Sequence, residues 1–174
     1  ANGTMWYHLE GDFDDDGDGV QDSTDLCQAG ALGWASDAST DHDSDGCQDS
    51  GEDADDDNDS VEDALDSCPS GEVGWAPDAS TDHDSDGCQD SSEDADDDND
   101  SIDDDLDSCS TGDLGWTSDN GTDWDSDGCQ DATEDDDDDN DSVSDDFDAC
   151  TPGDLGWTSA NGTDWDSDGC QDAT

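Results

Sequence analysis

The 174-residue chain has no Lys and no Arg, although 59 of its residues are Asp or Glu, and its formal net charge is −59 at pH 7. Nucleic-acid binding through counterion release needs basic side chains, so the composition excludes it. Contact with an anionic membrane would need bridging calcium, and we expect no direct membrane insertion. Because the chain has no internal cation, we expect folding to require cations from outside.

Apolar side chains are also scarce, since Leu, Ile, Val and Phe together make up 14 of the 174 residues. This is far below the roughly 20% at which a highly charged chain is expected to be disordered. No segment shows helical apolar periodicity, and Gly, Pro, Ser and Asp interrupt every stretch. We therefore expect sparse secondary structure, with bridges of two or three residues at most, in an array of locally stabilised units.

The eight Cys fall into two series that each advance by 41 residues. The series are Cys27, Cys68, Cys109 and Cys150, and Cys47, Cys88, Cys129 and Cys170. Pairing the two Cys of each repeat uses every thiol, whereas the shifted pairing from Cys47–Cys68 onward leaves Cys27 and Cys170 to pair between subunits. We predict the first scheme. Zinc ligation is disfavoured because no C-x-x-C occurs, and disulfides predict an extracellular or cell-surface protein.

The same 41-residue period organises the whole chain after a short unlike segment. The predicted parts are 1–13, 14–54, 55–95, 96–136 and the incomplete 137–174. The first part contains an apolar, strand-like run from Met5 to Leu9. No signal-peptide or transmembrane pattern is present, so we take Ala1 as the start of a mature chain.

Each repeat carries two acidic loops with the ligand spacing of a calcium site. Counting from its first Asp, a loop has carboxylates at positions 1, 3, 5, 9 and 12, and a Gly or Ser at position 6. Side chains at 1, 3 and 5 converge as the chain curls around an ion, position 6 makes the sharp turn, and position 12 closes the shell. The predicted ligands of the first loops are Asp14, Asp16, Asp18, Asp22, Asp25, Asp55, Asp57, Asp59, Asp63, Asp66, Asp96, Asp98, Asp100, Asp104, Asp107, Asp137, Asp139, Asp141, Asp145 and Asp148. Those of the second loops are Asp41, Asp43, Asp45, Asp49, Glu52, Asp82, Asp84, Asp86, Asp90, Glu93, Asp123, Asp125, Asp127, Asp131, Glu134, Asp164, Asp166, Asp168 and Asp172.

These loops predict at least eight Ca²⁺ ions. Many flexible carboxylates suit calcium better than magnesium, which prefers a small octahedral shell with retained water. They are not EF-hands, because only two residues separate Glu52 from Asp55 and leave no room for a helix. The alternative of a merely solvated acidic surface does not explain eight loops in register.

The stretch from Asp55 to Pro69 resembles the thrombospondin type 3 repeat, D-x-D-x-D-G-x-x-D-x-x-D-x-C-P, and the likeness covers residues 14–174. The resemblance implies a chain wrapped around a string of calcium ions, more than one ion per motif, and Cys pairing between neighbouring motifs. The expected fold class is thus an irregular, calcium-wrapped repeat array, an elongated rod of four tandem repeats with disulfides. The Gly-Trp insert resembles that of acidic microbial surface proteins, and the motif's closing Pro occurs only as Pro69.

A Gly-Trp pair recurs between the two Cys of each repeat. The Trp residues are Trp34, Trp75, Trp116 and Trp157. We expect each to cover the disulfide and the back of the loops, with carbohydrate stacking as the alternative. Position 2 of the second loops is His42, His83, Trp124 or Trp165. That position should point away from the metal, which favours surface packing over metal ligation by the two His.

Position 6 of the first loops is Gly19 in repeat 1 but Ser60, Ser101 and Ser142 afterwards. A positive φ there costs a non-Gly residue about 1 kcal/mol. The Ser residues complete glycosylation sequons, and every Asn of the chain starts one. The predicted glycan sites are Asn2, Asn58, Asn99, Asn120, Asn140 and Asn161. At position 4 of the first loops we expect the Asn side chain to point outward. The alternative to glycosylation is that Asn-Gly-Thr only forms turns and that Ser is merely tolerated at position 6.

We expect an extracellular structural protein, a calcium-stabilised, glycosylated rod or fibril subunit. The alternatives are a calcium-dependent adhesion or stalk module and a calcium buffer or mineral nucleator. No catalytic grouping recurs, so we do not expect an enzyme. Head-to-tail association is predicted because the loop from Asp164 lacks its closing acid, which Glu10 or Asp12 of a neighbour would supply; a chain that simply continues beyond Thr174 is the alternative.

Overall fold

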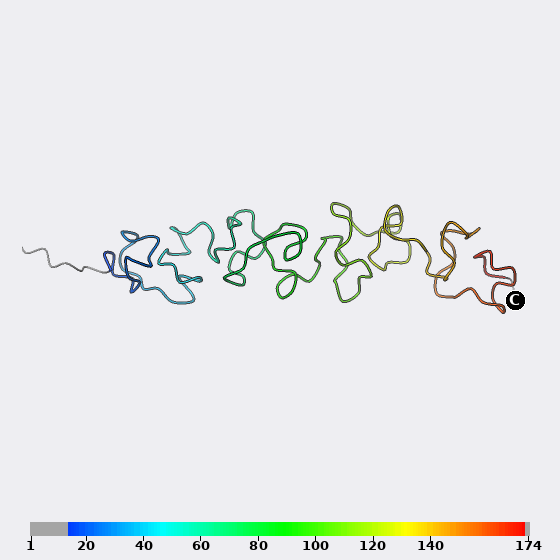
Figure 1. Ribbon diagram of the computed structural model, residues 1–174, viewed down its shortest axis with the longest axis horizontal. Helices are drawn as coiled ribbons and strands as arrows, with labels where there is room; N and C mark the ends of the chain where they lie inside the picture. The colour runs from blue at the N-terminus through cyan, green and yellow to red at the C-terminus, as the bar shows by residue number, and fades with distance from the viewer. Residues whose placement is uncertain (1–13, 173–174) are drawn as a thin grey trace, which may run out of the picture. The chain divides into compact units, whose positions relative to one another are not determined.

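The computed structural model describes residues 14–172, and this range forms no helix and no strand (Figure 1). Its backbone consists of turns, bends and irregular segments, so the prediction of little regular secondary structure is confirmed. Bridges of two or three residues are the expected upper limit, and residues 14–172 stay within it, with none formed. The strand-like run from Met5 to Leu9, the sequon at Asn2, and Glu10 and Asp12 lie outside the described residues.

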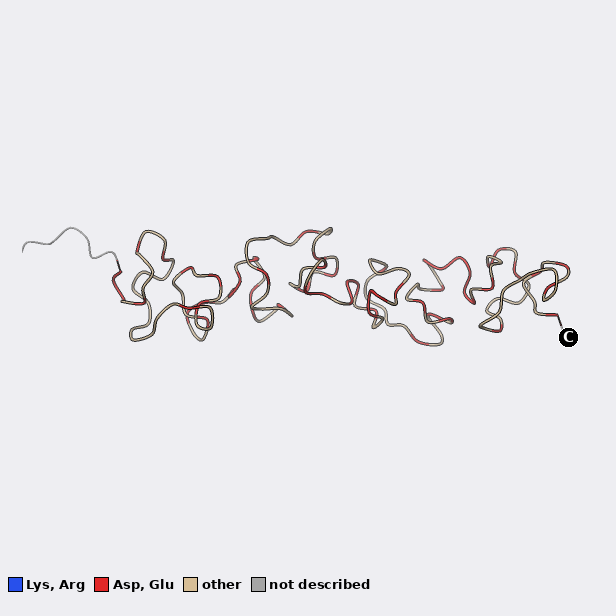
Figure 2. Ribbon diagram, turned by 90° about the horizontal axis from the view of Figure 1, so that it is seen from below, with Lys and Arg blue, Asp and Glu red and all other residues tan. Residues whose placement is uncertain are grey.

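The chain forms two compact units. One comprises the described residues up to Pro77 together with Asp86–Cys88, and the other comprises Asp78–Ser85 and the described residues from Gln89 onward. The division falls inside the second repeat, although turns and hydrogen bonds recur with the 41-residue period in both units. Figure 2 shows that acidic segments recur along the described chain.

The four disulfides follow the first pairing scheme. They join Cys27–Cys47, Cys68–Cys88, Cys109–Cys129 and Cys150–Cys170, with Cα–Cα distances of 5.1 to 5.3 Å. These distances are normal for a disulfide. Each bond closes a 20-residue segment, so each repeat carries its own covalent link.

The interior is made of carboxylates and disulfide sulfur. Among the described residues the only buried apolar side chains are Cys47, Cys88 and Cys129. The buried polar side chains are all Asp: Asp16, Asp18, Asp25, Asp41, Asp57, Asp59, Asp82, Asp97, Asp98, Asp100, Asp123, Asp139, Asp141 and Asp164. By contrast, Leu65, Leu106 and Phe147 are 75 to 78% exposed. Hydrophobic burial therefore does not hold this fold together, and another source of stability is needed.

The left-handed backbone conformation recurs at positions 4 and 6 of the loops. In the first loop of repeat 1 these positions are Gly17 and Gly19, with φ of 81° and 102°. In repeat 2 they are Asn58 and Ser60, with φ of 57° and 89°. The predicted positive φ at position 6 is thus confirmed also where Ser replaces Gly, and position 4 adds a second left-handed residue that the sequence analysis did not anticipate.

The described part of the chain contains no helix of the length and apolar character that a membrane span requires.

Candidate metal centres

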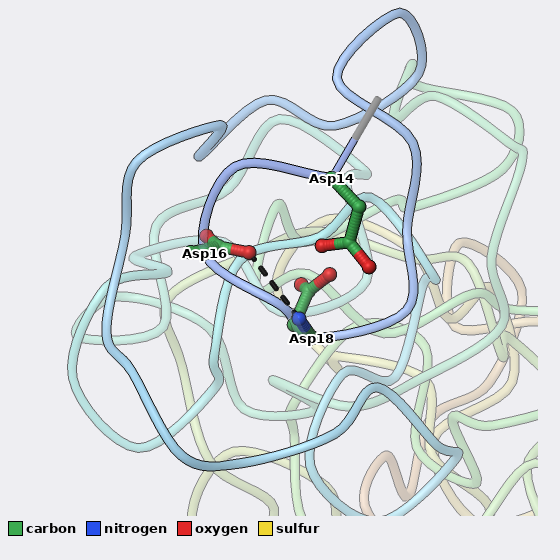
Figure 3. Close-up of side chains that lie close together, drawn as sticks. All are labelled: Asp14, Asp16 and Asp18. Atoms are coloured by element: carbon green, nitrogen blue, oxygen red, sulfur yellow. Dashed lines mark hydrogen bonds between the residues drawn. The ribbon is translucent and has the colours of Figure 1, made fainter. Parts of the chain in front are cut away.

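The first loop of repeat 1 brings together the carboxylates of Asp14, Asp16 and Asp18 (Figure 3). One oxygen of each lies within 4.8 Å of the other two, and the side chains project into the interior of the loop. Asp55, Asp57 and Asp59 form the equivalent group in repeat 2. Since calcium–oxygen bonds are about 2.3 to 2.6 Å long, ligands of one ion are at most about 5 Å apart, and this spacing fits a shared cation.

Backbone N–H groups hold these carboxylates in place. Gly17 N donates to Asp14 Oδ1 at 2.8 Å, and Asp18 N donates to Asp16 Oδ1 at 3.3 Å. Val20 N donates to Asp18 Oδ1 at 2.7 Å. The left-handed residues turn successive N–H groups toward the loop interior, which forms a nest that favours anions.

The other oxygen of several carboxylates is left without a hydrogen bond. Asp18 and Asp25 are each 3% exposed, and Cys27 N donates to Asp25 Oδ1 at 2.6 Å. Their Oδ2 atoms are buried and have no hydrogen-bond partner within residues 14–172. The same holds for Oδ2 of Asp66, Asp100, Asp107, Asp141 and Asp148. A buried carboxylate oxygen without a partner is costly, and a cation inside the loop would satisfy it.

In the second loops the residue at position 1 is the most deeply buried. Asp41 is 0% exposed and groups with Asp43 and Asp45. Its Oδ1 accepts the Asp45 N–H at 3.0 Å, and its Oδ2 accepts the Gly46 N–H at 3.3 Å. Asp123 and Asp164 are likewise 0% exposed. The spacing again fits a cation bound inside the loop.

Position 9 closes each loop through a hydrogen bond to position 2. Asp22 Oδ1 accepts the Asp15 N–H at 2.9 Å, and Asp49 Oδ1 accepts the His42 N–H at 3.1 Å. The equivalent acceptors are Asp63, Asp90, Asp104, Asp131, Asp145 and Asp172. One oxygen of each position-9 carboxylate thus already accepts a hydrogen bond from the backbone.

The predicted closing acid of the second loop is Glu52, and its carboxylate rests against Gly30. A Cβ added to Gly30 would lie 2.6 Å from Glu52 Oε1. The carboxylate of Asp53, one residue later, lies near Asp43 and Asp45. Burial and the charges of Asp45 and Asp53 raise the pKa of Asp43 to about 6. The signal in the sequence is an Asp that recurs at position 13, as Asp53, Asp94 and Asp135.

The two loops of a repeat pack on each other beside the disulfide. Leu26 N donates to Asp45 O at 2.8 Å, next to the Cys27–Cys47 bond. A Cβ on Gly46 would lie 2.4 Å from Asp25 Oδ1, so only Gly leaves room for this carboxylate. The position-6 Gly of the second loop therefore leaves room for a carboxylate of the first loop and also makes the turn of its own loop.

Position 2 of the second loop links one repeat to the next. His42 Nε2 lies 2.7 Å from Gly71 O, and Gly71 N in turn donates to Asp57 Oδ2 at 2.8 Å. Trp124 Nε1 donates to Gly153 O at 3.0 Å in the same way. His42 therefore has a structural partner, which weighs against the alternative that it is a metal ligand.

The sequon Asn at position 4 also reaches the preceding repeat. Asn58 Nδ2 donates to Asp43 Oδ2, and Asn140 Nδ2 donates to Asp125 Oδ2. Asn58 is exposed, as are Asn99, Asn120 and Asn161. Contrary to expectation, the Asn58 amide contacts the preceding repeat and does not point only into solvent. A glycan on Asn58 would replace one of the two N–H groups available for this contact.

Trp157 lies beside the disulfide of its own repeat. It lines a cavity of about 520 Å³ together with Trp124, Cys150 and Cys170. This placement agrees with the predicted covering role. The buried Nε1 atoms of Trp34, Trp75, Trp116 and Trp157 have no hydrogen-bond partner in the described range.

Crowding of like charges is the dominant electrostatic feature. Burial, with the neighbouring carboxylates, raises the pKa of Asp66 and Asp107 to about 6, and that of Asp138 to about 7. Two carboxylates about 4 Å apart repel by about 4 kcal/mol at an effective dielectric constant of about 20. Cations at these positions would convert this repulsion into attraction.

The donor set fits calcium. The clustered groups are carboxylate oxygens, the hard ligands that calcium prefers. Zinc thiolate chemistry is not available, because all eight Cys are in disulfides. The residues present could thus hold calcium within both loop types.

No protein-family model and no curated protein matches this chain. Its function is therefore inferred from the loops themselves.

Proposed function

We propose that this chain is an extracellular structural protein, a calcium-stabilised and glycosylated rod or fibril subunit built of thrombospondin type 3-like repeats. The observation that supports the proposal best is the interior of Asp side chains, in which oxygens such as Asp18 Oδ2 are buried and have no hydrogen-bond partner among the described residues. A chain without Lys or Arg cannot satisfy such oxygens with its own cations.

Charge balance supports the same conclusion. Repeat 2, residues 55–95, contains 15 acidic residues, so two divalent ions would lower its charge from −15 to −11. Metal binding would thereby supply folding free energy that hydrophobic burial does not, as in small metal-dependent domains.

The test is a calcium titration of the metal-stripped, disulfide-intact protein. We expect at least eight bound ions per chain, with near-ultraviolet circular dichroism from the Trp residues appearing as calcium is added. Magnesium at the same concentration should give a smaller signal. Binding of fewer than six ions, or a spectrum unaffected by calcium, would contradict the proposal.

Disulfides are typical of extracellular proteins, and the four in this chain support that location. Glycosylation is proposed for the sequon Asn residues, because Asn58, Asn99, Asn120, Asn140 and Asn161 are exposed. Intact mass spectrometry of protein from the native source tests it, since a mass equal to the bare 18.2 kDa chain would contradict it.

Assembly along the repeat direction is part of the proposal. Trp165 is 81% exposed, whereas Trp124 at the same loop position donates to Gly153 of the following repeat. A following repeat, from a second copy or from a longer chain, would give Trp165 the same partner. Electron microscopy of the chain with and without residues 1–13 tests head-to-tail association; filaments that still form without this segment would contradict its predicted role.

A further inference from the structure

A third group of carboxylates lies where one repeat meets the next. Asp49, Asp53 and Asp56 each offer an oxygen within 4.8 Å of the other two. Asp49 belongs to the second loop of repeat 1, Asp56 to the first loop of repeat 2, and Asp53 to the short connection between them. The 1, 3, 5, 9, 12 spacing does not predict this group, because it joins positions 9 and 13 of one loop to position 2 of the next.

Backbone N–H groups hold Asp49 and Asp53, and one oxygen each of Asp53 and Asp56 is left over. Asp49 Oδ1 accepts the His42 N–H, and Asp53 Oδ1 accepts the Ala54 N–H at 2.8 Å. Asp53 Oδ2 and Asp56 Oδ1 are buried and have no hydrogen-bond partner in the described part of the chain. A fourth carboxylate, Asp63, is held nearby because its Oδ1 accepts the Asp56 N–H at 2.9 Å.

The junction between repeats 2 and 3 gives an independent indication of a ligand. Asp97, equivalent to Asp56, is only 9% exposed, and its Oδ1 is buried without a hydrogen-bond partner among residues 14–172. The carboxylates of Asp104, Asp90 and Asp94 are its charged neighbours. A buried carboxylate among like charges is costly when ionised, and a cation bound between these side chains would offset that cost.

We propose that each junction between repeats binds a divalent cation of its own, namely calcium, distinct from the ions inside the loops. The sites are Asp49, Asp53 and Asp56; Asp90, Asp94 and Asp97; and Asp131, Asp135 and Asp138. The inference rests on the proposed calcium binding and extends it. The junction ion joins the second loop of one repeat to the first loop of the next, so it sets the connection between repeats while the loop ions stabilise each repeat.

Exposed carboxylates outside the three sites supply a control. Asp37, Asp78 and Asp119 recur at 41-residue intervals, and all three are exposed. Asn at these positions removes the same charge as in the test variant and keeps the oxygen that accepts the backbone N–H two residues later.

The experiment compares bound calcium in three full-length proteins by equilibrium dialysis at saturating calcium, with metal analysis of the protein. The test variant is Asp56→Asn/Asp97→Asn/Asp138→Asn, and the control is Asp37→Asn/Asp78→Asn/Asp119→Asn. We expect the test variant to bind three fewer ions than wild type and the control to bind the wild-type number. The single variant Asp97→Asn should bind one fewer.

The outcomes separate the two proposals. If wild type binds no calcium, the proposed function fails. If wild type binds calcium but the test variant binds as many ions as the control, then the loops bind calcium and the junctions do not. The junction carboxylates would then share protons instead of a cation. This result overturns the junction sites and leaves the proposed function standing. If the triple variant loses more than three ions through misfolding, Asp97→Asn decides: one ion lost supports the junction site, and no ion lost overturns it.

Discussion

The first and second loops share one ligand spacing, yet they bury different carboxylates. In the first loops positions 3 and 5 are buried, as with Asp57 at 1% and Asp59 at 0% exposure. In the second loops position 1 is buried, as with Asp41 at 0%. Gly71 N covers Asp57, whereas Asp41 receives two N–H groups from its own loop. Equal spacing therefore gives similar ligand sets, but the packing of each loop determines which of its carboxylates are buried.

This difference assigns the loops separate structural roles. The first loop is covered from its own repeat, because its Asp25 packs against Gly46. The second loop faces the following repeat through His42 and through the contact between Asp43 and Asn58. We expect changes in the first loop to affect a single repeat and changes in the second loop to affect the link between repeats as well.

Calcium removal should have the largest effect, because it empties both loop types at once. With a strong chelator, repulsion among unpaired carboxylates should expand the chain and abolish the near-ultraviolet circular dichroism of the Trp residues. Scattering and circular dichroism measure this, with the disulfides left intact. A chain that stays equally compact and keeps its spectrum would show that the carboxylates do not need cations.

The disulfide that joins the two loop types should come next. The double variant Cys109→Ser/Cys129→Ser removes the disulfide that closes a 20-residue segment. The chain-entropy estimate predicts that this lowers the free energy of unfolding by about 3 kcal/mol. Thermal or denaturant unfolding in saturating calcium measures the loss. The loops of the other repeats should keep their ions; a loss of calcium from all repeats would mean that repeats do not fold separately.

The packing of the first loop against the second can be tested at position 6. Gly46→Ser and Gly19→Ser both place Ser at a positive φ, 90° and 102°, but only Gly46 faces another atom, Asp25 Oδ1. We expect Gly46→Ser to cost about 1 to 3 kcal/mol through overpacking. Gly19→Ser should cost about 1 kcal/mol or less, since Ser60 occupies that position in the next repeat. Equal unfolding free energies for the two variants would refute the contact.

The link from the second loop to the following repeat should give the smallest effect. Trp124→Phe removes the N–H donated to Gly153 O and should cost about 1 kcal/mol. Trp165→Phe is the matched control, because Trp165 is 81% exposed and should tolerate the change. Both are compared by denaturant unfolding in calcium. If the variants are indistinguishable, the hydrogen bond does not contribute to stability.

Much of this fold could be predicted from local patterns. The irregular backbone follows from the scarcity of Leu, Ile, Val and Phe. The pairing of Cys27 with Cys47 follows from the 41-residue period once every thiol must be used within one chain. The grouping of Asp14, Asp16 and Asp18 follows from their spacing, because alternate side chains converge when so short a segment curls. These features depend on residues close in the chain or on exact repetition, so they can be predicted from the amino-acid sequence.

Contacts between residues far apart in the chain could not be predicted in this way, because they depend on the folded structure. Asp53 lies near Asp43, and Glu52 rests against Gly30, 22 positions earlier in the chain. His42 reaches Gly71, 29 residues away. The junction group of Asp49, Asp53 and Asp56 forms where the end of one loop meets the start of the next. Such contacts depend on how the disulfide and the left-handed residues orient each loop, and no spacing within a single loop contains that information.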